Sequence, residues 1–531
     1  MNEKVYPIDV YGVKKIGVEK WMNNYYIPVN GNEFLSIYKS IYSYYFHTLK
    51  QYNDDITYWC IISNIRIINV VAHFILESLQ AERLIEDGYE YIVGRDRKRI
   101  SRNICESDSN CLSRLKSTRS TMSKLTIVEK SKNYIRTLKY NLMPPYFINN
   151  KSISKSIVSP TFFVGYRSQQ EVISYCRENN ICPVHLHSLL FAKNAYNNTD
   201  DQFCVKIYTF AYDFLTLVKR RYPIIGKSHF EILKKEIEEC FKYSQIFLLN
   251  NVKALEKHKP KQLMITGTGF DIHKLFAASW RIAGGEVIGF THANSYFFGY
   301  TPATVINHLL LVNKFVAYSS GQKEILEKGI NDFSQGLKAS HIYPLKQNGY
   351  KRLFGKMQKE KVVNKINKIM LIGFPMVKGY YTSTPGAYAF AQLDLEIRLF
   401  KLLKSKGYYM IYKPHPDGIN AVEGIFDEYA DEVIKERFED VYDMADCLLF
   451  CNNWSTTLGF SLLTKKPVVL IDIKGNYWYS KAFELLKKRC SVVMSELDNS
   501  GRIEYDEGEV LDAIKASLGN INYDILYELA F

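Results

Sequence analysis

The stretch ADCLLFCNNWSTTLGFSLLTKKPVVLID, residues 445–472, decides the fold class of this 531-residue chain. It reads as a buried strand, a turn rich in hydroxyl groups, a helix and a second buried strand, which is the repeating unit of a parallel sheet. Ser455, Thr456 and Thr457 fall where the helix begins. Free backbone N–H groups and the helix dipole favour an anion there, so the turn predicts a phosphate site that needs no metal.

Strands and helices alternate over the second half of the chain. Short apolar runs separated by helix-length segments predict strands at 262–266, 286–291, 314–318, 369–373, 408–412, 447–451 and 468–471. The pattern is typical of doubly wound parallel sheets. Glycines, a proline and scattered lysines interrupt it over 343–365, so we place a domain boundary there, between residues 1–345 and 346–504. Helix-period apolar residues before the first sheet predict helices at 33–49 and 61–84 and a long amphipathic region over 201–257.

The segment Lys413-Pro414-His415-Pro416 directly follows one predicted strand. The two prolines stiffen the loop, so His415 can donate to a phosphate oxygen from a preset position while Lys413 adds positive charge. Ligands of such sheets bind beyond the carboxyl ends of the strands. We therefore expect Lys413, His415, Pro416 and Gly373 to converge with the hydroxyl turn on the phosphate of a nucleotide. Each residue taken alone is more often an ordinary surface group or helix cap, and only the combination favours the site.

The composition points to an anionic partner. The net charge is +14, from 69 Lys and Arg against 55 Asp and Glu, and the segment 95–139 carries thirteen basic residues against four acidic ones. This segment, placed in a basic helical region of about 95–140, suits anionic lipid headgroups or a charged glycan, although a solvated helical face is the alternative. Nucleic acid is disfavoured because no recognition module accompanies the charge. We expect a cytoplasmic protein, with peripheral attachment to the inner face of the cytoplasmic membrane as the further prediction.

Several other classes of protein are disfavoured. The ten cysteines are scattered without a C-x-x-C pair, which suits reduced thiols, and the amino terminus has no apolar signal region. No stretch approaches 18 uninterrupted apolar residues, so we expect no membrane-spanning helix. His185 and His187 alternate along one predicted strand but have no evident third ligand. We therefore predict neither a metal ion nor a cofactor.

The K-P-H-P segment and the hydroxyl turn that ends in Lys466-Pro467-Val468 together resemble the donor half of bacterial GT-B glycosyltransferases that use cytidine-activated sugars. That group includes sialic acid and Kdo transferases with an HP and an S motif, and CDP-glycerol glycerophosphotransferases are related in pattern. The resemblance covers residues 262–500. It implies a GT-B-like α/β fold with two Rossmann-like domains facing a cleft, and extra helical segments in the N-terminal half. The C-terminal domain would hold the donor, and a tail at 505–531 would pack back on the acceptor-side domain.

The resemblance also assigns an acceptor side. Thr291-His292-Ala293-Asn294 stands where these families carry Gln-His-Gly-Gly, so both glycines are replaced here. His292 ends a predicted strand and suits a general base near neutral pH, and Asp271 at a helix start is the rival base. Gly267 and Gly269 permit close approach of the backbone to a ligand, and Asn294 lies in the same acceptor region. The alternatives are a satisfied loop histidine and a simple helix cap.

The expected function is the metal-independent transfer of an acidic sugar, of sialic acid or Kdo type, from a CMP-activated donor. The acceptor would be a surface glycan or a lipid-linked glycan, as in capsule or lipopolysaccharide synthesis. Two alternatives remain open: a CDP-polyol phosphotransferase of the teichoic-acid type, and a glycan-assembly protein without catalytic activity.

Overall fold

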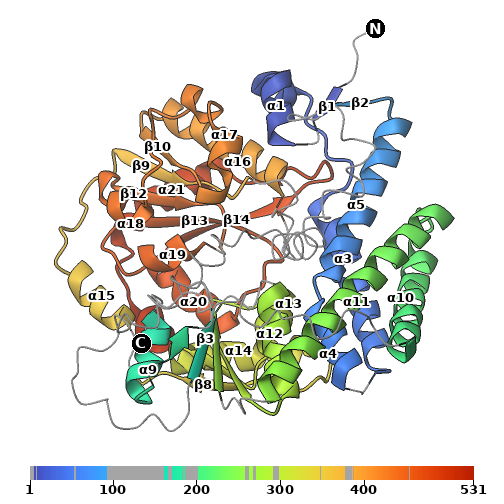
Figure 1. The fold of residues 1–531 in the computed structure, drawn as a ribbon. Coiled ribbons are helices and arrows are strands. Elements are labelled where there is room, and N and C mark those ends of the chain that lie inside the picture. Colours follow the sequence, from blue (N-terminus) through green and yellow to red (C-terminus); the bar gives the residue numbers. More distant parts are fainter. Residues whose placement is uncertain are drawn as a thin grey trace, which may run out of the picture.

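The computed structural model describes residues 5–7, 9–52, 55–92, 161–164, 170–181, 183–185, 201–256, 262–266, 271–290, 298–346, 349–376, 386, 388–453 and 455–531. Two large sheets lie one above the other in Figure 1, and a layer of helices runs along their right-hand side. Most of the strands are parallel and buried on both faces, which explains why they read as continuous apolar runs rather than as alternating ones.

The first sheet contains six parallel strands in the order β4-β3-β5-β6-β7-β8. Their bounds are β3 Thr161–Val164, β4 Val184–His185, β5 Gln262–Thr266, β6 Glu286–Phe290, β7 Lys314–Ala317 and β8 His341–Pro344. The connecting helices include α9 (Gln170–Glu178), α12 (Asp271–Ile282) and α14 (Ser320–Phe333). The chain adds strands on one side of β3 and then on the other, so the order reverses between β3 and β5.

The second sheet has seven strands in the order β11-β10-β9-β12-β13-β14-β15. Their bounds are β9 Lys368–Ile372, β10 Tyr409–Lys413, β11 Glu432–Val433, β12 Cys447–Phe450, β13 Val468–Ile473, β14 Ser491–Leu497 and β15 Ile503–Glu504. All pairs are parallel except β14 with β15. The first six strands therefore follow the order of a dinucleotide-binding fold, and the direction of winding reverses between β9 and β12.

Alternate residues of this second sheet enter two different cores. Ile369 and Leu371 of β9 pack in the core under α16 (Ala389–Ser405) and α21 (Glu507–Ala516). Met370 and Ile372 pack in the core on the opposite face, under α18 (Phe438–Val441), α19 (Thr456–Ser461) and α20 (Ser480–Arg489). The sheet is thus covered by helices on both faces. Successive side chains along each strand point to opposite faces, so they enter opposite cores.

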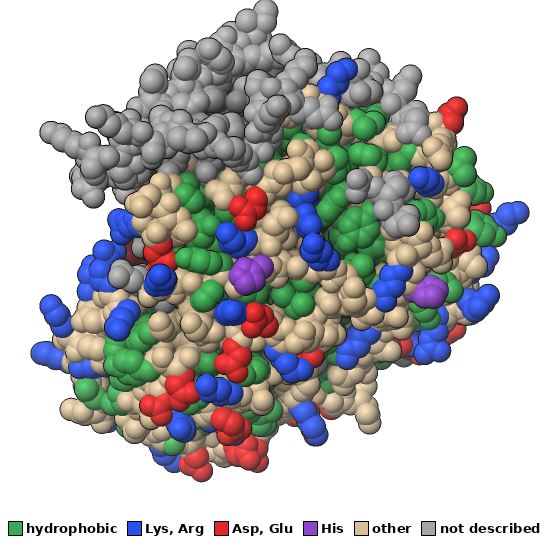
Figure 2. Space-filling view, turned by 90° about the horizontal axis from the view of Figure 1, so that it is seen from below, with side chains coloured by type: hydrophobic (Ala, Val, Ile, Leu, Met, Phe, Trp, Pro, Cys, Tyr) green, Lys and Arg blue, Asp and Glu red, His purple; other side chains and the backbone are tan. Residues whose placement is uncertain are grey.

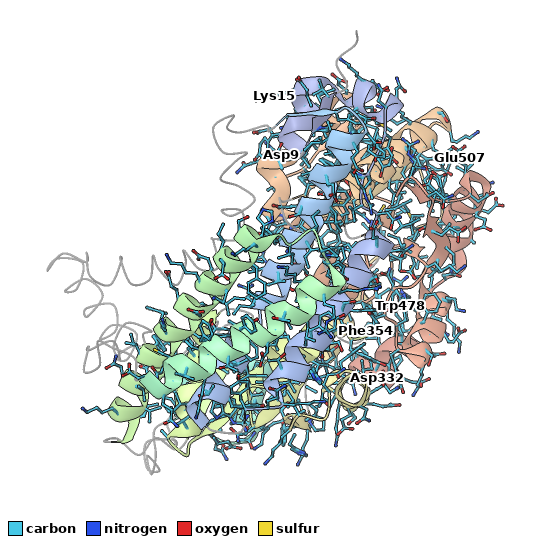
Figure 3. All side chains as sticks on the ribbon, turned by 90° about the vertical axis from the view of Figure 1, so that its right-hand side faces the viewer. Asp9, Lys15, Asp332, Phe354, Trp478 and Glu507 are labelled. Carbon is cyan, nitrogen blue, oxygen red and sulfur yellow. The ribbon has the colours of Figure 1, made fainter. Side chains whose placement is uncertain are left out.

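Five of the described helices that precede or interrupt the first sheet form a bundle against α12. They are α3 (Gly31–Leu49), α4 (Asp55–Ser63), α5 (Ile67–Glu86), α10 (Asp201–Arg221) and α11 (Lys227–Glu256). Figure 3 shows them from the right-hand side of Figure 1, with the α10 and α11 pair beside α3 and α5. These are the extra helical segments that the sequence predicted.

The predicted helix at 61–84 is broken into α4 and α5. The buried Asn64 explains the break, because its amide donates to the carbonyl of Cys60 at 2.6 Å and to the hydroxyl of Ser244 at 2.9 Å. No single helix in the described part of the chain is long and apolar enough to cross a membrane. One pair of helical segments meets that test only when the two are taken together. They are Ile56–Ser63 and Ile67–Glu86, with a bend of 47° between them.

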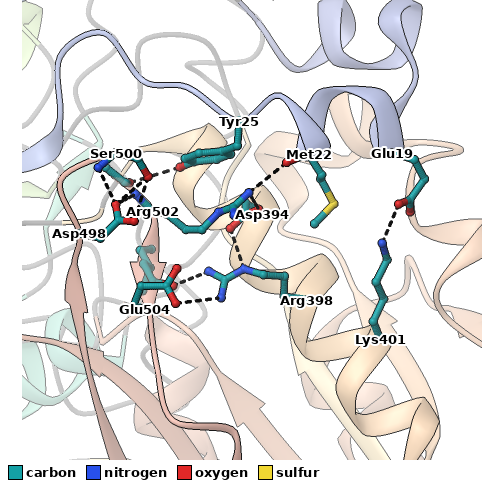
Figure 4. A network of polar contacts seen from close by, with 12 residues as sticks. Glu19, Met22, Tyr25, Asp394, Arg398, Lys401, Asp498, Ser500, Arg502 and Glu504 are labelled. Atoms are coloured by element: carbon teal, nitrogen blue, oxygen red, sulfur yellow. Dashed lines mark hydrogen bonds and ion pairs between the residues drawn. The ribbon is translucent and has the colours of Figure 1, made fainter.

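The amino-terminal segment packs with the second sheet, whereas the predicted boundary near residue 345 places it in the first domain. Strand β1 (Val5–Pro7) pairs with β2 (Glu90–Ile92), and α1 (Val10–Ile16) and α2 (Val18–Asn23) follow it. The guanidinium of Arg502 donates to the Met22 carbonyl at 3.1 Å and lies 4.3 Å from the ring centre of Tyr25 (Figure 4). Lys401 and Glu19 add an ion pair of 2.8 Å (Figure 4).

The two halves also meet beside β13 and at the carboxyl terminus. The backbone N–H of Tyr479 donates to the Phe298 carbonyl at 3.0 Å, and a Cβ on Gly299 would collide with the Tyr477 carbonyl. The hydroxyl of Ser319, at the start of α14, donates to the Leu529 carbonyl. Two parallel Rossmann-like sheets with added helices in the N-terminal half make the fold GT-B-like, as the sequence predicted.

Candidate functional site

The carboxyl edge of the second sheet brings together three of the predicted donor-binding segments. Strand pairing aligns Lys413 of β10 with Ile372 of β9, and Ile372 with Phe450 of β12. Because β9 lies between its two neighbours, the K-P-H-P segment, Gly373 and the turn before Ser455 leave the sheet side by side. They flank the point between β9 and β12 where winding reverses, which is where ligands bind in such sheets.

Two of these segments also share one face of the sheet. Ile411, Ile372 and Phe450 all belong to the core that α19 covers. Since side chains alternate along a strand, Lys413 extends from the same face as Ile411. The Lys413 side chain therefore rises on the face where the hydroxyl turn starts α19.

Lys413 is only 4% exposed. Its ammonium donates to the Pro414 carbonyl at 3.1 Å, its one hydrogen-bond partner within the described residues. Burial lowers the pKa of this lysine, while the nearby carboxylates of Glu436 and Glu439 act in the opposite direction. An ammonium has three donors, so two of them are left for an anion at this edge.

His415 is held so that one ring nitrogen points to the backbone. Its Nδ1 accepts the backbone N–H of Asp417 at 3.2 Å, which assigns the proton of the neutral ring to Nε2. Burial lowers the pKa of His415, Lys413 lowers it further, and Asp417 opposes both. The imidazole is therefore neutral near pH 7 and offers an Nε2–H donor. Pro416 begins a short 3-10 helix, Pro416–Gly418, that fixes the loop behind the ring.

Gly373 fits a position with no room for a side chain. Its N–H donates to the Lys413 carbonyl at 2.9 Å, and a Cβ there would collide with the Tyr412 hydroxyl. Glu396 on α16 accepts the Phe374 N–H at 2.7 Å and the Tyr412 hydroxyl at 3.0 Å. Burial raises the pKa of Glu396 to about 8. Glu396 thus fixes the start of the loop after β9, a role that sequence reasoning missed.

The hydroxyl turn begins α19 as predicted from the sequence. Ser455 is the N-cap residue but makes no capping bond with its side chain, and its hydroxyl instead pairs with that of Thr457. Thr456 is exposed. The Ser455–Thr457 pair does not involve the Thr456 hydroxyl. The turn therefore presents hydroxyl groups at the carboxyl edge of the sheet.

Arg489, which sequence reasoning also missed, holds the far end of α19. The side chain is 1% exposed and burial lowers its pKa. Its guanidinium donates to the backbone carbonyls of Ser461, Leu462, Thr464, Lys466 and Asn520, at 2.7 to 3.3 Å. In the sequence Arg489 directly follows two other basic residues, Lys487 and Lys488, so nothing there distinguished this role.

The acceptor side is described only in part. Asp271 is the first residue of α12, directly after the loop that follows β5. The Asp271 side chain lies outside the described part, as do four whole residues, Gly267, Gly269, His292 and Asn294. The strands before these loops, β5 and β6, end at the carboxyl edge of the first sheet. The roles of these five residues stay predictions. The role of the basic segment 95–139 also stays a prediction, because that segment lies outside the described residues.

Metal-ligating groups do not cluster in the described ranges: no three His, Cys, Asp or Glu side chains there could hold an ion. His185 lies in β4, and His187 is outside the described residues.

No protein-family model matches this chain, and no curated protein matches it. Among solved structures, the chain is similar to a lipopolysaccharide outer core galactosyltransferase, WaaB, in its apo form. The sequence identity is 10%, the TM-score is 0.29, and the match covers 54% of this chain and 80% of that chain. The strand orders of the two sheets, rather than this distant likeness, define the fold as GT-B-like.

Proposed function

We propose that this chain is a glycosyltransferase that binds a nucleotide-activated sugar at the carboxyl edge of its second sheet. One observation carries the proposal: a buried ammonium, Lys413, and a neutral imidazole donor, His415, lie where the winding of a dinucleotide-type sheet reverses. A buried lysine with a single carbonyl partner is costly unless an anion completes its surroundings. A donor phosphate supplies that anion.

The proposed donor is a CMP-activated acidic sugar of sialic acid or Kdo type. One ammonium together with neutral donors matches the single negative charge of a phosphodiester, whereas a diphosphate carries more charge to compensate. The resemblance of the K-P-H-P segment and the hydroxyl turn to cytidine-dependent transferases supports the same choice. The proposed acceptor is a surface glycan or a lipid-linked glycan.

Transfer breaks the bond between the sugar and the phosphate oxygen, and the electron pair leaves with CMP. Lys413, the Nε2–H of His415 and the hydroxyls of the turn would donate to the phosphate as its charge grows. The acceptor hydroxyl forms the new glycosidic bond and gives its proton to a base, for which His292 and Asp271 are the candidates. No metal takes part in the proposed route.

Product analysis with purified protein tests this function. CMP-sialic acid, CMP-Kdo and CDP-glycerol are incubated separately with the chain, and release of CMP is measured with and without a glycan acceptor. We expect CMP release from a CMP-sugar, and its loss in a His415→Ala variant. Consumption of CDP-glycerol alone would indicate the polyol-phosphate reaction, and no consumption of any donor would indicate a protein without this catalysis.

A further inference from the structure

The connection between the two sheets is the most basic exposed segment in the described part of the chain. Between residues 351 and 368 it contains seven Lys and Arg and one acidic residue, Glu360, a net charge of +6 out of the +14 of the whole chain. We call these residues the linker strip. Its basic members are Lys351, Arg352, Lys356, Lys359, Lys361, Lys365 and Lys368.

All seven basic side chains are exposed. Ion pairs occur at many other exposed lysines, but within the described ranges none reaches Arg352, Lys356, Lys359, Lys361, Lys365 or Lys368. The strip follows the left-hand edge of Figure 1, from α15 (Gly349–Met357) to β9. Figure 2, seen from below, shows Lys and Arg side chains gathered along that same edge. The positive charge of these six side chains is therefore not paired with a carboxylate of the described residues.

The inner side of the strip is fixed to the fold. Phe354 is buried, with its ring centre 4.9 Å from that of Tyr523. The amide of Gln358 donates to the Leu463 carbonyl at 3.2 Å, and Ile366 is buried. The backbone N–H groups of residues 367 and 368 both donate to the Asp446 carboxylate, at 2.9 Å. The lysines are thus held along a preset line, which reduces the entropy lost on binding.

We propose that the linker strip docks the protein on the surface of an anionic lipid bilayer. An anionic bilayer presents a continuous negative surface. Each exposed lysine near that surface is attracted to it, without having to face one particular lipid headgroup. Val362, 45% exposed in the middle of the strip, adds a small apolar contact for the headgroup region. The aromatic side chains of α15, Tyr350 and Phe354, are both buried, so this helix offers no exposed ring on which a nucleic-acid base could stack.

Docking through this strip leaves the candidate donor site open. Lys368 is the first residue of β9, so the strip reaches the sheet at the amino ends of the strands. The K-P-H-P segment and the hydroxyl turn lie at the carboxyl ends. The proposal therefore does not depend on the proposed enzymatic function, and each can fail without the other.

Co-sedimentation of the full chain with vesicles tests the proposal, using phosphatidylcholine alone or mixed with phosphatidylserine. The test variant changes Lys356, Lys359, Lys361 and Lys365 to Gln. The control changes Lys474, Lys487, Lys488 and Lys515 to Gln, removing equal charge from exposed lysines that already have ion-pair partners. We expect binding only to the mixed vesicles, lost near about 0.5 M salt, and about tenfold or more weaker in the test variant.

The control should bind within about twofold of the native chain, and calorimetric CMP affinity should be the same in all three proteins. Equal weakening in both variants would mean that net charge alone acts, and would overturn the proposal. So would unchanged binding in the test variant, equal binding to neutral vesicles, or binding to a soluble polyanion but to no vesicle.

Discussion

Lys413 and His415 owe their proposed role to burial and to one hydrogen bond each with the backbone. The bond from the Asp417 N–H fixes the tautomer of His415, and the Pro414 carbonyl leaves the Lys413 ammonium short of acceptors. Both groups thus have hydrogen-bond donors with no partner in the described protein. A half-buried hydrogen-bond donor that lacks a protein partner favours the binding of a ligand that carries an acceptor.

His415→Ala should weaken CMP binding while leaving the fold intact. Losing one hydrogen bond to a charged phosphate costs roughly 1.5 to 3 kcal/mol, which corresponds to about 10-fold to 150-fold in dissociation constant. Isothermal titration calorimetry measures the change. His341→Ala, at an exposed histidine on the edge strand β8, is the control and should bind CMP like the native chain. Unchanged affinity in His415→Ala would remove this residue from the site.

Glu396 makes the stability of the second domain depend on pH. Burial raises the pKa of this carboxyl to about 8, from an ordinary value of 4.5. The folded state therefore holds a proton that the unfolded state loses. The contribution of Glu396 to the free energy of unfolding is complete below about pH 4.5. It declines as the pH rises to about 8, by at most about 4 kcal/mol.

Glu396→Gln should reduce this decline, because the amide stays uncharged and can still accept the Phe374 N–H. Urea unfolding of both proteins at several values between pH 5 and pH 8.5 measures the difference. Glu484→Gln changes an exposed carboxylate on α20 and should keep the native slope. If the free energy of unfolding changes with pH equally in the native protein and in Glu396→Gln across this range, Glu396 does not hold a buried proton.

At the scale of elements, α19 depends on an arginine from a different helix. Arg489 of α20 donates to the carbonyl of the last residue of α19, to three carbonyls in the segment after it and to that of Asn520. Arg489→Met should therefore destabilise the protein by about 3 kcal/mol or more, because several buried carbonyls lose their donor at once. Urea unfolding measures this, and Lys488→Met, at an exposed neighbour, should stay within about 0.5 kcal/mol. Equal stabilities of the two variants would show that the carbonyls find other donors.

The elements that sequence could predict are those with a strong local pattern. Apolar runs located β5, β6, β7, β9, β10, β12 and β13 to within one or two residues. Strands β11 and β15 have two residues each, and the helix α15 lies among the lysines that suggested a break, so no clear periodicity marked them. The prediction of one helix over 61–84 was wrong at Asn64, because one of the two bonds that its amide makes there reaches Ser244 on the distant helix α11.

The candidate site divides in the same way. Lys413, His415 and the hydroxyl turn could be predicted together, because the carboxyl ends of parallel strands meet at one edge. Glu396 and Arg489 could not, because only the folded chain brings them near their partners, which are backbone groups and, for Glu396, also the Tyr412 hydroxyl. A carboxylate in the largely apolar helix α16 was the available signal for Glu396, and it does not identify the partner. Arg489 ends a run of basic residues, in which nothing distinguishes it from Lys487 and Lys488.

At the scale of the whole molecule, the two sheets are joined by more than the linker strip. The amino-terminal segment packs on the second sheet before the chain enters the helical bundle of the first half. The turn at 477–479 contacts residues 298–299, and the carboxyl-terminal residues contact the start of α14. These contacts tie both carboxyl edges to one framework, as transfer between a donor and an acceptor requires.

A crystal structure of the chain with CMP would show where the nucleotide binds. We expect the phosphate within hydrogen-bonding distance, about 2.7 to 3.2 Å, of the Lys413 ammonium or the His415 Nε2, beside the start of α19. CMP bound elsewhere, such as at the carboxyl edge of the first sheet, would contradict this expectation, as would crystals grown at saturating CMP with this edge of the second sheet empty.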